Sequence, residues 1–195
     1  MYTEELIILM NIEWGSEAAR KFATNVGLTT SNGPHGYNIM ATEWTHHVSY
    51  EPGLIAVCLH PEHATTENIR KTEMFGVNIC AFDQNVVSSV SGNNTGKEVN
   101  KIKVLEGFGV QFYKAKKIDV LMVKGAAANF ECKLINEMEI GDHIMFIGEA
   151  VDISFSDKTP LVLSSGKYWK LTESIQKPAK DVTNKIDELV EKYKK

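Results

Sequence analysis

The second half of the chain contains the feature that most restricts its fold, a pair of long alternating segments. Residues 127–138 and 142–155 alternate apolar and polar side chains, and residues 139–142 form a short turn between them. Alternation with a period of two puts the apolar side chains on one face of a strand, and a tight turn pairs two such strands antiparallel. The sequence therefore predicts a domain built around an antiparallel hairpin.

Shorter segments support a mainly β fold and argue against a common alternative. Four further runs are apolar or β-branched and have the length of strands: residues 26–30, 48–50, 54–59 and 75–81. Three segments have helical signals: 15–23 with Ser16 as cap, 65–71 with Thr65 or Thr66 as cap, and 85–90. Strands do not alternate with long helices and no GxGxxG motif occurs, so a β-barrel or sandwich is favoured over a Rossmann sheet.

The C-terminal segment has a different pattern. Apolar residues recur there at helical spacing with charged residues between them, namely Val182, Ile186, Leu189, Val190 and Tyr193. We therefore expect a domain over residues 1–175 and an amphipathic helix within 176–195. That helix could dock on its own domain or on a partner subunit.

Charge and cysteine content restrict the possible partners and location. The 195-residue chain has a formal net charge of −4, which argues against nucleic-acid binding because phosphate backbones need a basic surface. Three widely spaced cysteines lie in apolar runs, as expected for core residues of a cytoplasmic protein. The apolar run at residues 6–10 is too short to cross a membrane and follows acidic residues, so neither a membrane span nor a targeting segment is predicted.

Two segments could bind an anion. A helix beginning at Thr65 and Thr66 would offer unpaired amide groups and two hydroxyls, although an ordinary helix cap explains the same residues. The segment 91–101 resembles a P-loop only superficially. Three residues instead of four separate Gly92 from Gly96, and Glu98 stands where Ser or Thr must bind magnesium. We read it as a loop that ends in a lysine, Lys101, which is either an anion ligand or a surface residue.

Six pieces of sequence occur in a specific order along about 130 residues: Asn38, Trp44, Thr65, Lys101, Gly141-Asp142-His143 and Tyr168. In this order the chain resembles the flavin reductase-like, FMN-binding split-barrel family, which includes flavoredoxins and small NAD(P)H:flavin or ferric reductases. The resemblance covers roughly residues 20–175. It implies a six-stranded antiparallel Greek-key split β-barrel with peripheral helices, and a homodimer.

The resemblance also implies an FMN site. Thr65, with Thr66 beside it, and Lys101 are expected near the phosphate. Asn38 and Trp44 are expected to line the flavin from a loop with exposed amides, although Trp44 could equally be a core residue. The complete predicted set of cofactor-binding residues is Asn38, Thr42, Glu43, Trp44, Thr45, His60, Thr65, Thr66, Ser91, Lys101, His143 and Tyr168. Glu43 departs from the family, which often has Ser there, so a side-chain contact from this position stays open.

His143 is the predicted catalytic residue. The resemblance places it near the flavin and the nicotinamide, where it would position the cofactor or act as a proton partner. Tyr168 would stack on an exposed edge of the flavin, with Trp169 as the rival for that role. His60, at the end of its strand, is expected to be a pocket residue.

A metal site is not predicted. The histidines and acids near residues 43–63 have neither HExxH nor zinc-finger spacing. His46 and His47 are adjacent, and neighbouring residues of a strand point to opposite faces.

The function implied by the resemblance is that of an FMN-binding oxidoreductase. It would transfer a hydride from NAD(P)H to the flavin and electrons onward to free flavin, ferric iron or a redox protein. If FMN is held loosely, the reduced flavin would pass to a partner monooxygenase. Two alternatives stay open: a non-enzymatic FMN-binding electron carrier of flavoredoxin type, and a small-molecule binder without flavin.

Overall fold

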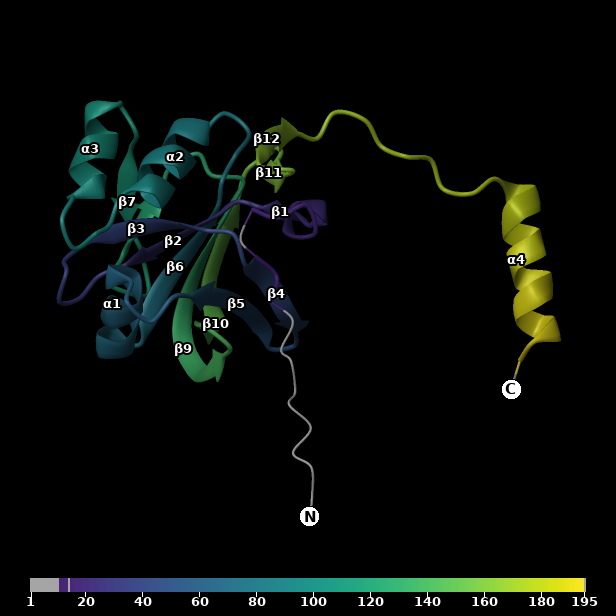
Figure 1. Cartoon of the computed structure of the whole chain (residues 1–195), viewed down its shortest axis with the longest axis horizontal. Helices are drawn as coiled ribbons and strands as arrows, with labels where there is room; N and C mark the ends of the chain where they lie inside the picture. Colours follow the sequence, from purple (N-terminus) through teal and green to yellow (C-terminus); the bar gives the residue numbers. More distant parts are fainter. Residues whose placement is uncertain (1–10, 14, 195) are drawn as a thin grey trace, which may run out of the picture.

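The computed structural model describes residues 11–13 and 15–194 of the chain. Its centre is a seven-stranded antiparallel sheet in the order β3-β2-β6-β9-β10-β5-β4 (Figure 1). The strands of this sheet are β2 (Gly27–Ser31), β3 (Asn38–Thr42), β4 (Thr45–Tyr50), β5 (Gly53–Leu59), β6 (Met74–Ile79), β9 (Ala128–Ile140) and β10 (His143–Phe155). The predicted mainly β, antiparallel fold is confirmed, with seven strands in the main sheet rather than the six expected.

The remaining elements surround this sheet. Small strands form a three-stranded sheet, β1 (Ala23–Asn25), β11 (Leu161–Ser164) and β12 (Lys167–Lys170), and a two-stranded sheet, β7 (Phe112–Lys114) and β8 (Leu121–Val123). The helices are η1 (Ala19–Lys21), α1 (Ala64–Thr72), α2 (Asn85–Asn93), α3 (Lys101–Gly107) and α4 (Lys180–Lys192). None of the described helices is both long and apolar enough to span a membrane.

The predicted hairpin is the longest feature of the sheet. Strands β9 and β10 pair from Ala128↔Phe155 to Ile140↔His143, and only Gly141 and Asp142 lie between them. Gly141 has φ of 63°, a left-handed conformation that glycine adopts at no steric cost. The turn is therefore shorter than predicted, and the hairpin itself is confirmed.

The sheet curls because its two edge strands are consecutive in the chain. Strands β3 and β4 lie at opposite ends of the pairing order, yet only Glu43 and Trp44 separate them. The Thr45 hydroxyl donates to the Thr42 carbonyl over 3.1 Å at this corner. The two edges thus meet there, although no β3–β4 ladder forms among the described residues. The structure establishes a strongly curled sheet, which is less than a fully hydrogen-bonded barrel.

Two apolar cores hold helices against the sheet. One includes Ile69 of α1 packed with Phe75, Val77 and Phe146. Gly148 makes room for this core, since a Cβ there would lie 2.6 Å from the ring of Phe75. The other core joins the sheet to α2 and α3 through Leu28, Ile39, Val87, Ile102 and Leu105. Burying each of these large side chains contributes roughly 1.5–3 kcal/mol, and the packing fixes the helix ends that the site uses.

Several local predictions are wrong at element ends. Residues 38–42 form strand β3 rather than a loop, because they pair in full register with β2. Helix α2 continues through Ser91 to Asn93, where a loop was expected, and α3 was not predicted. The N-cap of α1 is His63 rather than Thr65 or Thr66, because the helix begins at Ala64, and the His63 side chain makes no capping hydrogen bond. The N-cap of the short helix η1 is Ala18 rather than the predicted Ser16, although the Ser16 hydroxyl accepts a hydrogen bond from the Ala19 amide over 3.2 Å.

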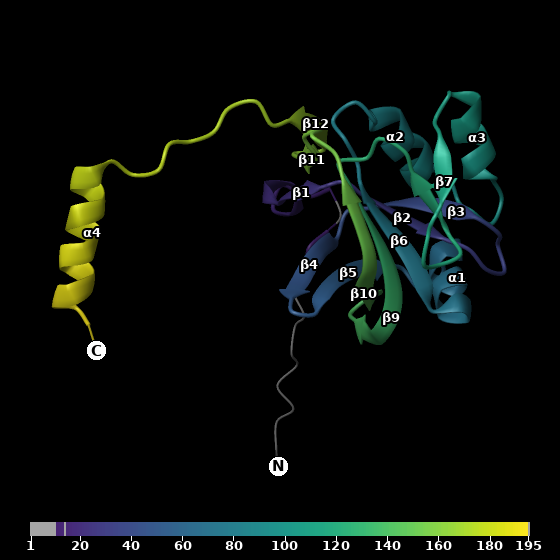
Figure 2. The same cartoon turned by 180° about the vertical axis from the view of Figure 1, so that it is seen from behind.

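Helix α4 lies apart from the other elements in both views (Figures 1 and 2). All its residues are exposed, including the apolar stripe from Val182 to Tyr193. The predicted amphipathic helix is confirmed. The division of the chain at residue 175 and the docking of this helix stay predictions.

Candidate functional site

The phosphate end of the predicted site is a buried polar contact between β3 and α1. Asn38 begins β3 and its amide donates to the Thr65 hydroxyl over 2.9 Å, in the first turn of α1. Both residues are buried. Gly96 packs against them from the loop after α2, and a Cβ there would lie 2.4 Å from the Asn38 Oδ1. The structure therefore brings two predicted residues together and adds Gly96, whose role the sequence did not reveal.

Lys101 is the most unusual residue of this region. It begins α3, is 3% exposed, and its Nζ donates to the Ser91 carbonyl over 3.2 Å. Within the described residues, no ion pair includes Lys101. Burial lowers the pKa of Lys101 to about 8 because a charged ammonium is costly away from water. The buried Ser91 hydroxyl has no hydrogen-bond partner in the described structure. A buried cation beside a free hydroxyl can bind an anion.

An aromatic row forms the other end of the site. Trp44 is 53% exposed, so the core interpretation of this residue is wrong. Its ring centroid lies 4.5 Å from that of His143, and His143 lies 5.9 Å from His60 in an edge-on contact. Trp44 comes from the β3–β4 corner, His60 from the end of β5 and His143 from the start of β10. These three predicted residues thus meet in a partly exposed aromatic cluster, whose rings are tilted by 47° (Trp44 and His143) and 90° (His60 and His143) to one another.

Asp142 orients the His143 ring. The Nδ1 of His143 lies 2.7 Å from the Asp142 carboxylate, and this hydrogen bond, before other causes, lowers the pKa of Asp142. A carboxylate can only accept, so the Nδ1 carries the proton and the Nε2 is the ring atom left for a ligand.

His63 lies near both ends of the predicted site and was not among the predicted site residues. Its ring lies 5.7 Å from that of His60, and its Nδ1 is buried without a partner in the described structure. Burial lowers the pKa of His63, and the positive charges of His60, His143, Lys101 and Lys97 lower it further. The sequence did contain a hint of this residue, because His63 follows His60 by three positions, but that spacing suggested only a metal site.

Four other predicted residues have structural partners. The hydroxyls of Thr29 and Thr42 lie 2.8 Å apart inside the sheet, and the Thr45 hydroxyl bonds the Thr42 carbonyl. The Thr66 hydroxyl donates to the His60 carbonyl over 2.8 Å. The side chain of Glu43 is exposed, and its carbonyl accepts from Thr24. The structure gives these side chains no opening toward a ligand, except for Glu43.

Tyr168 lies over α2. Its hydroxyl is 2.9 Å from that of Ser88, one turn before Ser91, while the Trp169 indole donates to the Ser164 carbonyl. The side chains of both aromatic residues are about half-exposed. No described aromatic contact links either residue to Trp44 or His143. The choice between Tyr168 and Trp169 stays open.

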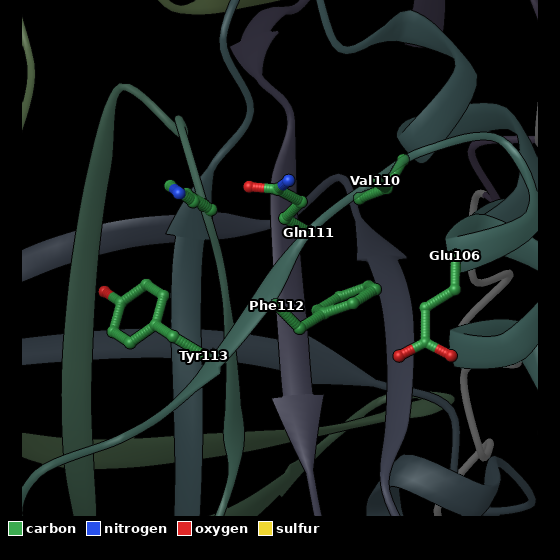
Figure 3. Close-up of a pocket in the computed structure, with 6 residues that line it drawn as sticks. Glu106, Val110, Gln111, Phe112 and Tyr113 are labelled. Carbon is green, nitrogen blue, oxygen red and sulfur yellow. The ribbon is translucent and has the colours of Figure 1, made fainter.

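Two hollows of similar size lie beside α3. One, of about 500 Å³, has Phe112 directed toward Glu106 and is lined by none of the predicted residues (Figure 3). The other, of about 510 Å³, is lined by Asn38, Gly96 and Lys97 among others and therefore adjoins the phosphate end. The hollow of Figure 3 thus lies outside the predicted site.

The two histidines of β4 and the buried cysteines lie outside the predicted site. His46 and His47 lie side by side with ring centroids 4.5 Å apart, so the expectation of opposite faces is wrong. In the described part of the chain, no three His, Cys, Asp or Glu side chains gather in a way that could hold a metal ion. Burial raises the pKa of the Cys80 and Cys132 thiols to about 12, which keeps them unreactive core residues.

Comparison with known proteins identifies the family. The profile of the flavin reductase like domain matches residues 19–172. The chain therefore belongs to the flavin reductase-like family.

Two relatives whose names state an activity match different lengths of this chain. It is 25% identical over 161 residues to an NADH-dependent flavin reductase from Rhodococcus sp, covering 80% of this chain and 84% of that protein. It is 32% identical over 104 residues to a ferric-chelate reductase (NAD(P)H) from Archaeoglobus fulgidus, covering 52% and 58%. The matching segments also span 67% and 66% of two archaeal proteins, from Pyrococcus abyssi and Archaeoglobus fulgidus.

A solved structure shares the fold. Flavin reductase PheA2 in its native state superposes with a TM-score of 0.68 and is 32% identical, covering 80% of this chain and 95% of that one.

Proposed function

We propose that this protein is a flavin reductase that holds FMN between the Lys101 region and the aromatic row, and that uses NADH or NADPH as donor. The observation that carries the proposal is the buried Lys101 ammonium, whose hydrogen bond goes to a neutral carbonyl. A buried charge without a counter-ion is costly, and an arriving anion would remove that cost. Family membership then favours a flavin phosphate as this anion.

The residues present fit such a ligand. The unpartnered Ser91 hydroxyl and the Thr65 hydroxyl could donate to phosphate oxygens beside Lys101. The first amide groups of α1 add the positive end of a helix. Trp44 and His143 could bound a flat ring on the exposed side. A bound flavin would supply the redox chemistry, since it accepts a hydride from NAD(P)H and passes electrons on.

His143 would be the group of the protein nearest the reacting ring. Its Nδ1 proton is held by Asp142, so its Nε2 could accept a hydrogen bond, or donate one when the ring is protonated. The role assigned to it is to orient the flavin or the nicotinamide and to hold a proton at Nε2.

The proposal has two versions, which differ in the final electron acceptor. The Rhodococcus relative is named a flavin reductase, which favours free flavin, and the archaeal relative is named a ferric-chelate reductase, which favours ferric iron. A released flavin would serve a partner monooxygenase. A homodimer is likewise proposed from the family resemblance, and a cytoplasmic location from the three unpaired cysteines. Light scattering on the purified chain tests the dimer.

An anaerobic visible spectrum tests the proposal. The full chain is mixed with FMN, then with NADH, and separately with NADPH. We expect loss of the oxidised flavin band with at least one nucleotide at a rate far above that of free FMN. A bound yellow flavin that neither nucleotide bleaches would indicate an electron carrier. A protein that ignores FMN would overturn the proposal and favour a binder without flavin.

A further inference from the structure

His63 is placed where a ligand anion would meet the head of α1. It is the cap of this nine-residue helix, two residues before Thr65. Its Nδ1 is buried and lacks a partner in the described structure, so one of its two ring nitrogens is left for something that the chain does not supply. Glu62, its neighbour in the chain, is exposed and does not face it as a counter-ion.

The groups around His63 are cationic or can become so. His60 lies on β5, His143 on β10, Lys101 on α3 and Lys97 in the loop before α3, and their charges all act on His63. Acids neutralise only two of them. Glu67 pairs with Lys97 over 2.6 Å, and Asp142 pairs with His143 over 2.7 Å.

Lys101, His60 and His63 are therefore left without an acidic partner among the described residues. Adding one more positive charge at His63 is unfavourable until a negative charge arrives. The burial of the ring acts in the same direction, and the lowered pKa of His63 agrees with this geometry.

We propose that His63 is a proton-coupled contact for the phosphate of bound FMN: it is uncharged in the free protein and takes one proton from solvent when the phosphate binds. This inference rests on the proposed function. The charge of the phosphate would offset the repulsion from Lys101 and from neighbouring histidines, and the imidazolium would add a charge-assisted donor. His63 would thus be a positioning residue that makes affinity depend on pH.

The prediction separates FMN from riboflavin, which lacks the phosphate. Between the pKa of His63 in the free protein and its higher pKa in the complex, each rise of one pH unit should weaken FMN binding by up to about tenfold through this one proton. Above the higher pKa this dependence ends, because His63 is then uncharged in both states. Riboflavin binding should lack that dependence on His63, because no anion reaches it.

The experiment is an NMR titration of ring-labelled histidines in the full wild-type chain, alone, with FMN and with riboflavin. His63→Gln serves to assign the signal, and His47→Gln, an exposed histidine on β4, is the matched control. We expect the His63 pKa to lie below the usual value in the free protein and to rise by at least one unit with FMN only. We also expect His63→Gln to weaken FMN at pH 6.5 by about tenfold and riboflavin by less than twofold.

The outcomes distinguish the two proposals. A His63 pKa that FMN leaves unmoved, while FMN binds and NADH or NADPH bleaches it, overturns the role of His63 alone. Equal shifts with FMN and riboflavin would show that the ring, not the phosphate, acts on His63, and would also overturn it. Failure of FMN to bind at all overturns the proposed function together with this inference. The pKa values are read from the wild-type chain, and His63→Gln is needed only to show which signal disappears.

Discussion

Two buried charges of opposite sign differ in what surrounds them. Glu131 on β9 and Lys101 on α3 are each 3% exposed. Glu131 accepts hydrogen bonds from the Lys116 and Lys117 amides over 2.8 and 2.7 Å, so the chain itself satisfies its charge. Lys101 donates to one neutral carbonyl. A buried charge that the fold satisfies stabilises the fold, and one that the fold leaves unsatisfied is available to a ligand.

Glu131→Gln should have the largest effect on stability. The amide of Gln can accept from one of the two backbone N–H groups but turns a donor toward the other, and hydrogen bonds to a charged group contribute roughly 1.5–3 kcal/mol. We expect the free energy of unfolding to fall by about 3 kcal/mol in a denaturant titration.

The matched control is Glu137→Gln on the same strand. Glu137 pairs with Arg70 and both side chains are about 40% exposed, so a loss of at most about 0.5 kcal/mol is expected. Similar losses of unfolding free energy in the two variants would contradict this prediction, because burial would then not determine how much a charged side chain stabilises the fold.

Lys101→Met should affect ligand binding more than stability, the opposite of Glu131→Gln. Removing an uncompensated buried charge should leave the free energy of unfolding unchanged or raise it. Losing a charge-assisted contact worth roughly 2–3 kcal/mol should weaken FMN about 100-fold. Riboflavin binding, measured by the same fluorescence titration, should change less than threefold.

Lys71→Met, at the exposed end of α1, is the control and should alter neither ligand. Equal losses of FMN and riboflavin in Lys101→Met would remove the phosphate role. A clearly less stable free protein would show that Lys101 supports the fold after all.

The pH dependence of stability sharpens the same contrast. The pKa of Lys101 is about 8 in the folded chain, well below its ordinary value, so the unfolded chain binds more protons between pH 8 and about 10.5. Stability from this group therefore rises as pH rises through that window, by up to about 1.4 kcal/mol per pH unit. Unfolding free energies of wild type and Lys101→Met at pH 7, 8, 9 and 10 give the difference directly. Parallel curves would contradict the shift.

The sequence predicted periodic elements well and contacts between distant loops poorly. The β9–β10 hairpin and the core strands were predictable because burial imposes a period of two on their side chains. Helix α3 was not, because Lys101 and Lys103 in its first turn have the pattern of a surface loop. The order of motifs predicted that Asn38, Trp44, Thr65 and His143 belong to one site, and the structure adds the direct contacts of Asn38 with Thr65 and of Trp44 with His143. The spacing of His60 and His63 suggested only a metal site, and Gly96 has no local signal, since the surroundings of both residues depend on segments that only the folded sheet brings near.

Gly96→Ala tests whether the contact between Asn38 and Thr65 is needed for FMN binding. The added Cβ would lie 2.4 Å from the Asn38 Oδ1 and should displace the side chain that bonds Thr65. We expect FMN affinity to fall about tenfold, equal to about 1.4 kcal/mol, with a smaller change in stability. Gly107→Ala, in the last turn of α3 with no heavy atom within 4 Å of the added Cβ, should leave FMN binding unchanged. Equal FMN affinities in the two variants would exclude Asn38 from the site.

Deleting residues 176–195 supplies the baseline for the comparison, because α4 buries none of its residues. A segment that removes no side chain from water has almost no burial to lose, so the free energy of unfolding should change by less than about 0.5 kcal/mol. The measurement is a denaturant titration of the shortened chain at two protein concentrations tenfold apart. A larger, concentration-dependent loss would contradict the expectation and would mean that the apolar stripe from Val182 to Tyr193 packs against a second copy in solution. With no loss, the stabilities of Glu131→Gln and Lys101→Met can be read as properties of the β-domain alone.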